Sequence, residues 1–261
     1  MARHTAFKSI LITGASSGLG ASLARAYAAP GVTLGLIGRS QDKLDRVAEF
    51  CRAAGAQVHA AAIDVADADA LGAWIKDYES AAPVDLVVAN AGTSAGPAPG
   101  IAAEGLTLAT RQVQTNLLGV MNTVEPLLPS FLARGHGRIA IVSSIAGYRG
   151  LPYSPAYSAS KAGARAYGEA IRAMLGPRGI PVTVICPGFF SSPMTDRFKG
   201  PTPFLFTLER TAAIVKRGID AGRPRVAFPS ILVLGLRLAD LLPAAIGDAI
   251  MRANRFHIVS G

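Results

Sequence analysis

Short apolar runs rich in β-branched residues alternate along this chain with longer, alanine-rich stretches of helical character. This alternation predicts βαβ units, in which helices cover both faces of a parallel sheet and the strands are apolar along their whole length. The crossovers between the strands are expected to be right-handed. We therefore predict an α/β fold with a doubly wound parallel sheet, with strands at Ser9–Thr13, Val32–Ile37, Val58–Ile63, Val84–Ala89, Ile139–Ser143 and Val182–Cys186.

The pattern runs on without an internal repeat, a low-complexity tract or a linker, so we expect a single domain over residues 1–261. The composition, 50% hydrophobic against 16% charged, is that of a chain that folds around a core. A segment rich in proline and phenylalanine, about 187–206, predicts a long loop that acts as a lid or a substrate-binding surface. An apolar helical extension is expected over about 229–261.

The formal net charge is +9 and favours anionic partners in general. Basic residues are scattered and form no run of five or more, whereas nucleic-acid binders usually cluster them on one face. We therefore expect no nucleic-acid partner.

Cysteine usage and hydropathy argue against several other classes of protein. Cys51 and Cys186 are far apart and have no metal-ligand spacing, so neither a disulfide framework nor a metal site is expected. The apolar run Ile10–Ile12 is too short for a signal-peptide core, and Val226–Leu236 is far short of the roughly 20 residues that cross a bilayer. The expected location is cytoplasmic, with peripheral membrane contact as an open option.

A glycine-rich turn follows the first predicted strand, in the segment Thr13–Gly20, and a helical stretch at Ala21–Ala29 comes next. Gly14, Gly18 and Gly20 would allow a tight turn and let a pyrophosphate approach backbone N–H groups at the positive end of a helix. Strand, turn and helix in this order predict a Rossmann-like dinucleotide site.

The residues after the second strand bear on the choice of dinucleotide. A carboxylate there would bind the adenosine ribose hydroxyls and repel a 2′-phosphate, but this chain has Arg39 and Ser40. A guanidinium and a hydroxyl suit a phosphate, which predicts NADP(H) over NAD(H). The alternative is that Arg39 is a solvated surface arginine.

Tyr157 and Lys161 are four residues apart in a stretch that is expected to be helical over Pro155–Leu175, so both side chains face the same way. A phenol has a pKa of about 10, and lowering it by about three units requires roughly 4 kcal/mol of preferential phenolate stabilisation. A nearby ammonium, reinforced by an oxidised nicotinamide, can supply this stabilisation.

With these features in view, the chain resembles the short-chain dehydrogenase/reductase family over about residues 8–195. The resemblance rests on the TGxxxGxG turn at Thr13–Gly20, on Asn90-Ala91-Gly92 after the fourth strand, on Ser144 at the end of the fifth strand, and on the YxxxK pair. Asn116 matches the family's active-site asparagine, and Pro187-Gly188 matches the segment after the sixth strand.

The resemblance implies hydride transfer between a nicotinamide and a carbonyl or alcohol carbon. Tyr157 would be the general acid or base, Ser144 would polarise the substrate oxygen, Lys161 would lower the pKa of Tyr157 and bind the nicotinamide ribose, and Asn116 would position a relay water. The cofactor-binding residues implied by the motifs, together with the Arg39 and Ser40 prediction, are Gly14, Ser16, Ser17, Gly18, Leu19, Gly20, Arg39, Ser40, Asp64, Val65, Asn90, Ala91, Gly92, Tyr157, Lys161, Pro187, Gly188, Phe190 and Ser192. The resemblance also implies a seventh strand, at Pro224–Phe228. A homodimer or homotetramer built from helices around Asn116–Leu132 and Pro155–Leu175 is implied as well.

The substrate is expected to be a lipophilic ketone or alcohol, such as a steroid-like, terpenoid or long-chain acyl compound. This prediction rests on an apolar lining at Ala146–Tyr153 and in the 187–206 loop, namely Phe189, Met194, Phe198, Phe204 and Phe206. Two alternatives are a reductase of 3-ketoacyl groups on a carrier and a cofactor-sensing or scaffold protein without turnover. The C-terminal extension could dock a partner subunit, extend the substrate pocket or lie on an anionic membrane.

Overall fold

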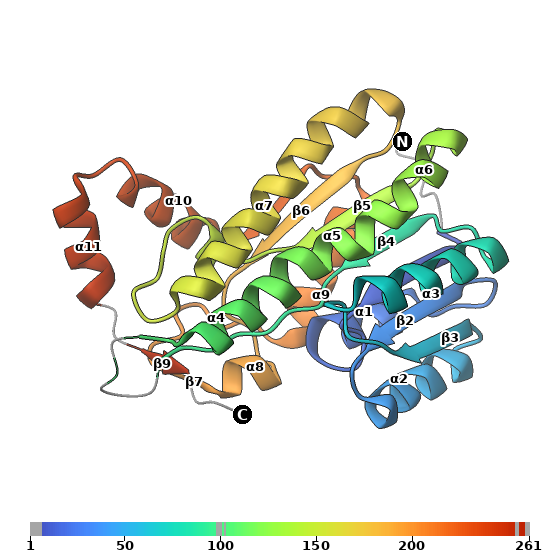
Figure 1. The fold of residues 1–261 in the computed structure, drawn as a ribbon, viewed down its shortest axis with the longest axis horizontal. Coiled ribbons are helices and arrows are strands. Elements are labelled where there is room, and N and C mark those ends of the chain that lie inside the picture. The colour runs from blue at the N-terminus through green and yellow to red at the C-terminus, as the bar shows by residue number, and fades with distance from the viewer. Residues whose placement is uncertain (1–6, 98–100, 102, 254–255, 259–261) are drawn as a thin grey trace.

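The computed structural model describes residues 7–97, 101, 103–253 and 256–258. Its main body is a seven-stranded sheet in which every pairing is parallel, as the sequence predicted (Figure 1). The spatial order of the strands is β3 (Gln57–Ala62), β2 (Thr33–Gly38), β1 (Ser9–Thr13), β4 (Leu86–Ala89), β5 (Arg138–Val142), β6 (Val182–Pro187) and β8 (Arg225–Phe228). The order reverses between β1 and β4, which is where an open α/β sheet offers a ligand crevice at its carboxyl ends.

Helices cover both faces of the sheet, which explains why its central strands are apolar without alternation. Along β1, Ile10 and Ile12 belong to the core under one helical layer, and Leu11 belongs to the core under the other. One layer consists of α1 (Gly18–Tyr27), α2 (Gln41–Ala53) and α9 (Leu208–Asp220). The other is formed by α3 (Ala68–Ala81), α4 (Leu106–Val113), α5 (Gly119–Val124), α6 (Leu128–Arg134) and α7 (Pro155–Leu175).

The predicted strand ends differ from the observed ones by up to two residues. The fourth strand begins at Leu86, two residues later than predicted, and in the two residues before it Glu79 accepts the N–H of Val84 and the Asp85 carboxylate accepts the N–H groups of Lys8 and Ser9. The first helix begins at Gly18, earlier than predicted, and α7 has the predicted bounds.

The chain after β6 forms the loop and the extension that the sequence predicted. The loop holds only the short helix α8 (Pro193–Asp196) and strand β7 (Phe198–Lys199) before α9. The extension forms α10 (Ser230–Ala239), α11 (Ala244–Ala253) and β9 (His257–Ile258), and β9 pairs with β7 in a separate antiparallel ribbon. Residues 254–255 and 259–261 of the predicted extension lie outside the described residues. Across the described chain, none of the helices has the length and apolar character that spanning a membrane requires.

Candidate active site

The turn between β1 and α1 is built to bring the backbone close to a ligand. Gly14 and Gly18 have positive φ angles of 66° and 53°, which other residues adopt only with strain. A Cβ atom on Gly20 would lie 2.3 Å from the Gly14 carbonyl oxygen, so Gly20 has no room for a side chain. Gly20 itself does not line the cavity in front of the turn, and its part is to let α1 pack against the turn.

The amino terminus of α1 faces this cavity and has no side chain that caps it. Ser17, the residue before the helix, makes no side-chain hydrogen bond to the helix N–H groups, and the first turn contains no acidic residue. Uncapped N–H groups at the positive end of a helix are suited to a pyrophosphate. The residues present therefore fit the phosphates of a dinucleotide.

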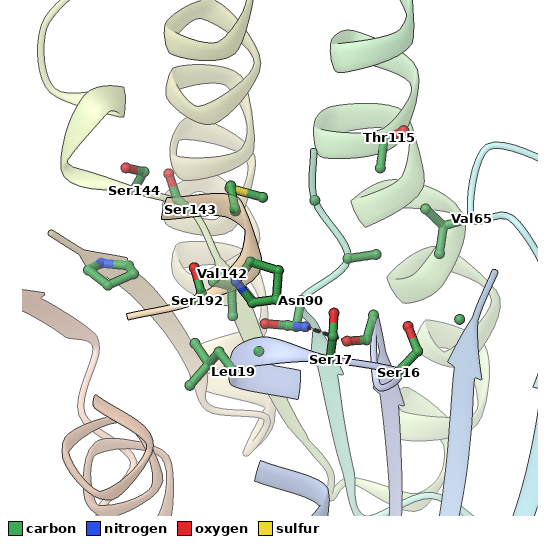
Figure 2. Close-up of a pocket in the computed structure, with 18 of the residues that line it drawn as sticks. Ser16, Ser17, Leu19, Val65, Asn90, Thr115, Val142, Ser143, Ser144 and Ser192 are labelled. Atoms are coloured by element: carbon green, nitrogen blue, oxygen red, sulfur yellow. Dashed lines mark hydrogen bonds between the residues drawn. The ribbon is translucent and has the colours of Figure 1, made fainter. Parts of the chain in front are cut away.

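The cavity holds about 220 Å³ and extends from this turn to the ends of β4, β5 and β6. Figure 2 shows Ser16 and Ser17 at one end of it and Ser143 and Ser144 toward the other, with Asn90 between them. Every predicted cofactor residue lines it except Gly20 and Ser40, and Thr115 and Val142 add to the lining. Ser40 instead precedes α2 and makes no capping hydrogen bond there.

Asn90 connects the ends of β1 and β4. Its amide nitrogen donates to the carbonyl oxygens of Thr13 (2.9 Å) and Gly14 (3.3 Å), and the Thr13 hydroxyl accepts the N–H groups of Asn90 and Ala91. This network fixes the glycine turn against β4.

At the end of the cavity beside β2, Arg39 is exposed and lines the cavity with Gly38 and Ser16. A Cβ atom on Gly38 would lie 3.1 Å from the Ser16 hydroxyl oxygen, so Gly38 lets Ser16 lie against the end of β2. Asp64 also lines this part, and its carboxylate accepts the N–H of Ala66.

Lys161 lies one turn after Tyr157 on α7 and is 3% exposed. Its ammonium donates to the carbonyl oxygen of Val142 (3.0 Å) at the end of β5 and lies 6.0 Å from the centre of the Tyr157 ring. Burial lowers the pKa of Lys161 to about 8, because the charged form loses hydration that one carbonyl replaces only in part.

Tyr157 and Ser144 form the polar contact at the far end of the cavity. Burial raises the pKa of the Tyr157 phenol, and a hydrogen bond with Ser144 opposes that rise. The protein alone therefore keeps Tyr157 protonated at neutral pH. The positive charge of an oxidised nicotinamide, if bound here, would favour the phenolate form that the sequence predicted.

Asn116 is fully buried and does not line the cavity. Its side chain accepts the Thr93 N–H (2.7 Å) and donates to the Thr93 carbonyl (2.9 Å) and to the Ser160 hydroxyl (3.0 Å). It lies on a π-helical turn, Gln114–Leu118, and a Cβ atom on Gly92 would be 3.3 Å from its Oδ1 and 3.2 Å from the Lys161 ammonium. Asn116 and Lys161 thus lie on either side of Gly92, with Asn116 outside the cavity and Lys161 in its lining.

A second cavity of about 550 Å³ adjoins the first, and the two share Ser144, Tyr157, Gly188, Phe190, Ser192 and Met194. Its lining is mostly apolar. Phe189, Met194 and Phe198 line it as predicted, together with Ala146, Leu151 and Pro152. The predictions for Phe204 and Phe206 are wrong, because Phe204 is 54% exposed and Phe206 stacks on Phe228.

The C-terminal extension supplies one wall of this cavity, and extending the pocket was one of the three roles that the sequence left open for it. Leu232, Leu236, Leu242, Met251, Phe256 and Ile258 all line the second cavity. Phe256 stacks on Phe198, with ring centres 4.7 Å apart. The apolar character of the segment was visible in the sequence, but its return to the 187–206 loop depends on the β7–β9 pairing.

Comparison with known proteins identifies the family. A family model described as short chain dehydrogenase matches residues 8–201. The chain belongs to the short-chain dehydrogenase/reductase family.

Three relatives illustrate the match, and on this basis the chain is an oxidoreductase. An uncharacterized oxidoreductase of Myxococcus xanthus is 37% identical over 95% of this chain and 98% of its own. A 3-oxoacyl-[acyl-carrier protein] reductase of Brucella melitensis with bound NAD is 27% identical, with a TM-score of 0.72 over 84% of this chain and 88% of its own. A variant of actinorhodin polyketide ketoreductase with NADPH is 28% identical, with a TM-score of 0.73 over 84% of this chain and 94% of its own. The fold of this family binds nicotinamide cofactors.

The buried ammonium of Lys161 leads to a prediction about stability. Without cofactor, Lys161→Met should raise the free energy of unfolding by about 2 kcal/mol at pH 7, because it removes a desolvated charge at the cost of one hydrogen bond. The folded pKa lies below the unfolded one, so the wild-type penalty is complete below pH 8 and disappears as the pH rises toward 10.5. The gain in the variant should disappear over the same range.

Urea denaturation at pH 7, 8.5 and 10 measures this effect. The exposed Lys199→Met change is the matched control and should alter stability by less than about 0.5 kcal/mol at each pH. A less stable Lys161→Met protein at pH 7, or a gain that does not depend on pH, would contradict the prediction.

Proposed function

We propose that the protein is an NADP(H)-dependent reductase of lipophilic carbonyl compounds. The observation that carries the proposal is the junction of the two cavities: Ser144 and Tyr157 lie where a polar cavity fit for a dinucleotide meets a larger apolar one. A carbonyl group at this junction would have its oxygen near two hydroxyl groups and its apolar body between α10, α11 and the 187–206 loop.

The proposed chemistry assigns one task to each side chain. The nicotinamide, when bound, supplies or accepts a hydride. Tyr157 donates a proton to the carbonyl oxygen in reduction, and its raised pKa keeps that proton in place at neutral pH. Ser144 donates a hydrogen bond to the same oxygen and stabilises the charge that develops on it.

Lys161 and Asn116 act behind Tyr157 in this proposal. Lys161 holds the nicotinamide ribose and favours the phenolate that remains after proton transfer. Asn116 is a positioning residue, because its Thr93 and Ser160 hydrogen bonds hold the backbone beside the Lys161 ammonium. A relay water would have to lie on the Lys161 side of Gly92.

The choice of NADP(H) rests on the adenosine end of the first cavity. Arg39 is the cation that lines it there, and Ser16 adds a hydroxyl group within the same turn. Asp64, at the end of β3, is the carboxylate in this lining and suits the adenine edge. Relatives of the same fold occur with NAD and with NADPH, so the preference depends on these local residues.

A second candidate substrate class is a 3-ketoacyl thioester on a carrier. Two of the similar solved structures are a 3-oxoacyl-[acyl-carrier protein] reductase and a polyketide ketoreductase, and the net charge of +9 suits an acidic carrier. The apolar wall formed by the extension favours the free lipophilic carbonyl compound.

Tyr157→Phe tests the mechanism. NADPH oxidation with a series of ketones graded in length should rise with length in the wild type and fall by about 10³-fold or more in the variant, because the proton donor is lost. NADPH affinity should change less than about threefold, since the ring remains in place. Tyr167→Phe, on the same helix with its hydroxyl bonded to Glu125, is the matched control and should retain turnover.

Two outcomes of this assay count against the proposal. Full turnover by Tyr157→Phe would refute the mechanism. Rates that rise only when the ketone is offered as a carrier thioester would move the substrate to the second class.

Arg39→Ala tests the cofactor assignment. The KM for NADPH should rise about tenfold or more, as expected for a lost charge-assisted hydrogen bond, while the KM for NADH stays within about twofold. Arg46→Ala, an exposed arginine on α2 that does not line the cavity, should change neither value. Equal effects on both cofactors would contradict a 2′-phosphate contact.

We also propose a homodimer or homotetramer built from the helices around Asn116–Leu132 and Pro155–Leu175. Large apolar side chains on these helices are exposed, including Leu118 (45%), Leu132 (41%) and Met174 (70%). Sedimentation velocity should give a multiple of the 26.9 kDa chain mass, and a monomer at micromolar concentration would contradict the proposal.

A further inference from the structure

Arg149 connects the loop after β5 to both helices of the C-terminal extension. Its Nη1 donates to the Ala239 carbonyl (3.1 Å) at the end of α10 and to the Asp240 carboxylate (2.8 Å), and its Nη2 donates to Asp248 (3.2 Å) on α11. The planar fork of a guanidinium can hold three such acceptors at once, which the single ammonium of a lysine cannot do in the same geometry.

The surroundings of Arg149 leave little freedom for this side chain. It is 14% exposed, and a Cβ atom on Gly247 would lie 2.5 Å from its Nη2, so a glycine allows the guanidinium to lie against α11. The two carboxylates are 51% and 59% exposed, so the pairs are open to water and to salt on their acidic side.

The other end of the extension is attached by β9. This strand pairs with β7, and Phe256 stacks on Phe198 and packs edge-on against Tyr153. Figure 1 shows α10 and α11 projecting beyond the end of the sheet, beside the loop that leads into α7. The position of α10 and α11 is thus set at three places: where α10 begins after β8, where Arg149 binds near the α10–α11 turn, and where β9 pairs with β7.

Helices α10 and α11 and the turn between them form one wall of the apolar cavity. This wall includes Leu236, Leu242 and Met251. Leu234 on α10 and Leu241 in the turn after it do not line the cavity and are 58% and 81% exposed, so no described segment packs over them from outside. Val233 and Leu236 hold α10 in a cluster with Ile145, next to Ser144, so a displacement would widen the cavity on its α11 side, where a long substrate would reach.

We propose that Arg149 is a positioning residue that determines selectivity for long apolar substrates by fixing the α10–α11 wall. It touches neither the dinucleotide cavity nor the apolar one. A short ketone at Ser144 and Tyr157 does not need the wall, whereas a long one gains its binding energy there, in proportion to the apolar area that it buries. This proposal rests on the proposed function, because it takes the second cavity as the substrate site.

The experiment compares wild type, Arg149→Ala and Arg149→Lys on a short and a long ketone with NADPH. Arg149→Ala should raise the KM for the long ketone about tenfold, and kcat/KM for the short ketone should stay within about twofold. Arg149→Lys, which keeps the charge without the fork, should fall between them. Arg178→Ala, an exposed arginine before the amino end of β6 and away from both cavities, is the matched control and should match the wild type.

Salt provides a second readout in the wild type. Raising NaCl from 0.05 to 1 M screens the exposed ends of the Asp240 and Asp248 pairs, and it should raise the KM for the long ketone more than that for the short one. In Arg149→Ala this difference between the ketones should disappear. Equal losses on both ketones, or no change on either, would overturn the role of Arg149.

Hydrogen exchange separates this proposal from the proposed function. Backbone amide hydrogens of residues 230–253 should exchange faster in Arg149→Ala than in the wild type. Those in the part of α7 that ends at Leu175 should exchange at the same rate in both. If no ketone is turned over by the wild type, the proposed function fails, and the exchange data still test whether Arg149 fixes the α10–α11 wall. Unchanged exchange over 230–253 would overturn the proposal whatever the kinetics.

Discussion

The hydrogen bonds of Asn90 are the interaction on which the rest of the site depends. They join the carboxyl ends of β1 and β4, where the strand order of the sheet reverses, and they hold the Gly14 carbonyl against the amino end of α1. With that turn fixed, the uncapped N–H groups of α1 point into the cavity instead of toward protein acceptors. The candidate phosphate site, formed by the glycine turn and the amino end of α1, is therefore a consequence of how β1 and β4 end.

The other half of the site is maintained at a cost in stability. Lys161 is buried beside a carbonyl acceptor, and its lowered pKa means that its charged form is less stable in the folded chain than in water. Hydrophobic contacts on both faces of the sheet offset this cost, since Ile139 and Ile141 of β5 belong to the core on one face and Ala140 and Val142 to the core on the other. A buried ammonium is thus supported by packing that has no chemical role.

The sequence was most informative where a local pattern determines the structure. Apolar runs and the glycine turn predicted six of the seven strands of the main sheet and the position of the turn, because strand burial and turn geometry depend on neighbouring residues. The seventh strand was expected only from the family resemblance. It was least informative where residues distant in the chain meet. Phe204 and Phe206 look as apolar as Phe198, and only the β7–β9 pairing and the Phe206–Phe228 stack decide which of them faces the cavity. Arg149 belongs to no sequence motif, since its carboxylate partners lie 91 and 99 residues further along the chain.

Because β9 pairs with β7, the C-terminal segment forms a cavity wall that is separate in sequence from the β1–β6 segment. Substitutions in the two segments would therefore have different effects. The segment from β1 to β6 carries the candidate phosphate site and the Ser144, Tyr157 and Lys161 cluster, and substitutions there alter the chemistry or the fold. Much of the apolar wall comes from the described residues of 231–258, none of which lines the cavity beside the glycine turn. If the apolar cavity holds the substrate, as proposed, substitutions in that segment would change which molecules enter while the reaction stays the same, so new substrate ranges would arise in this architecture without a loss of catalytic function in between.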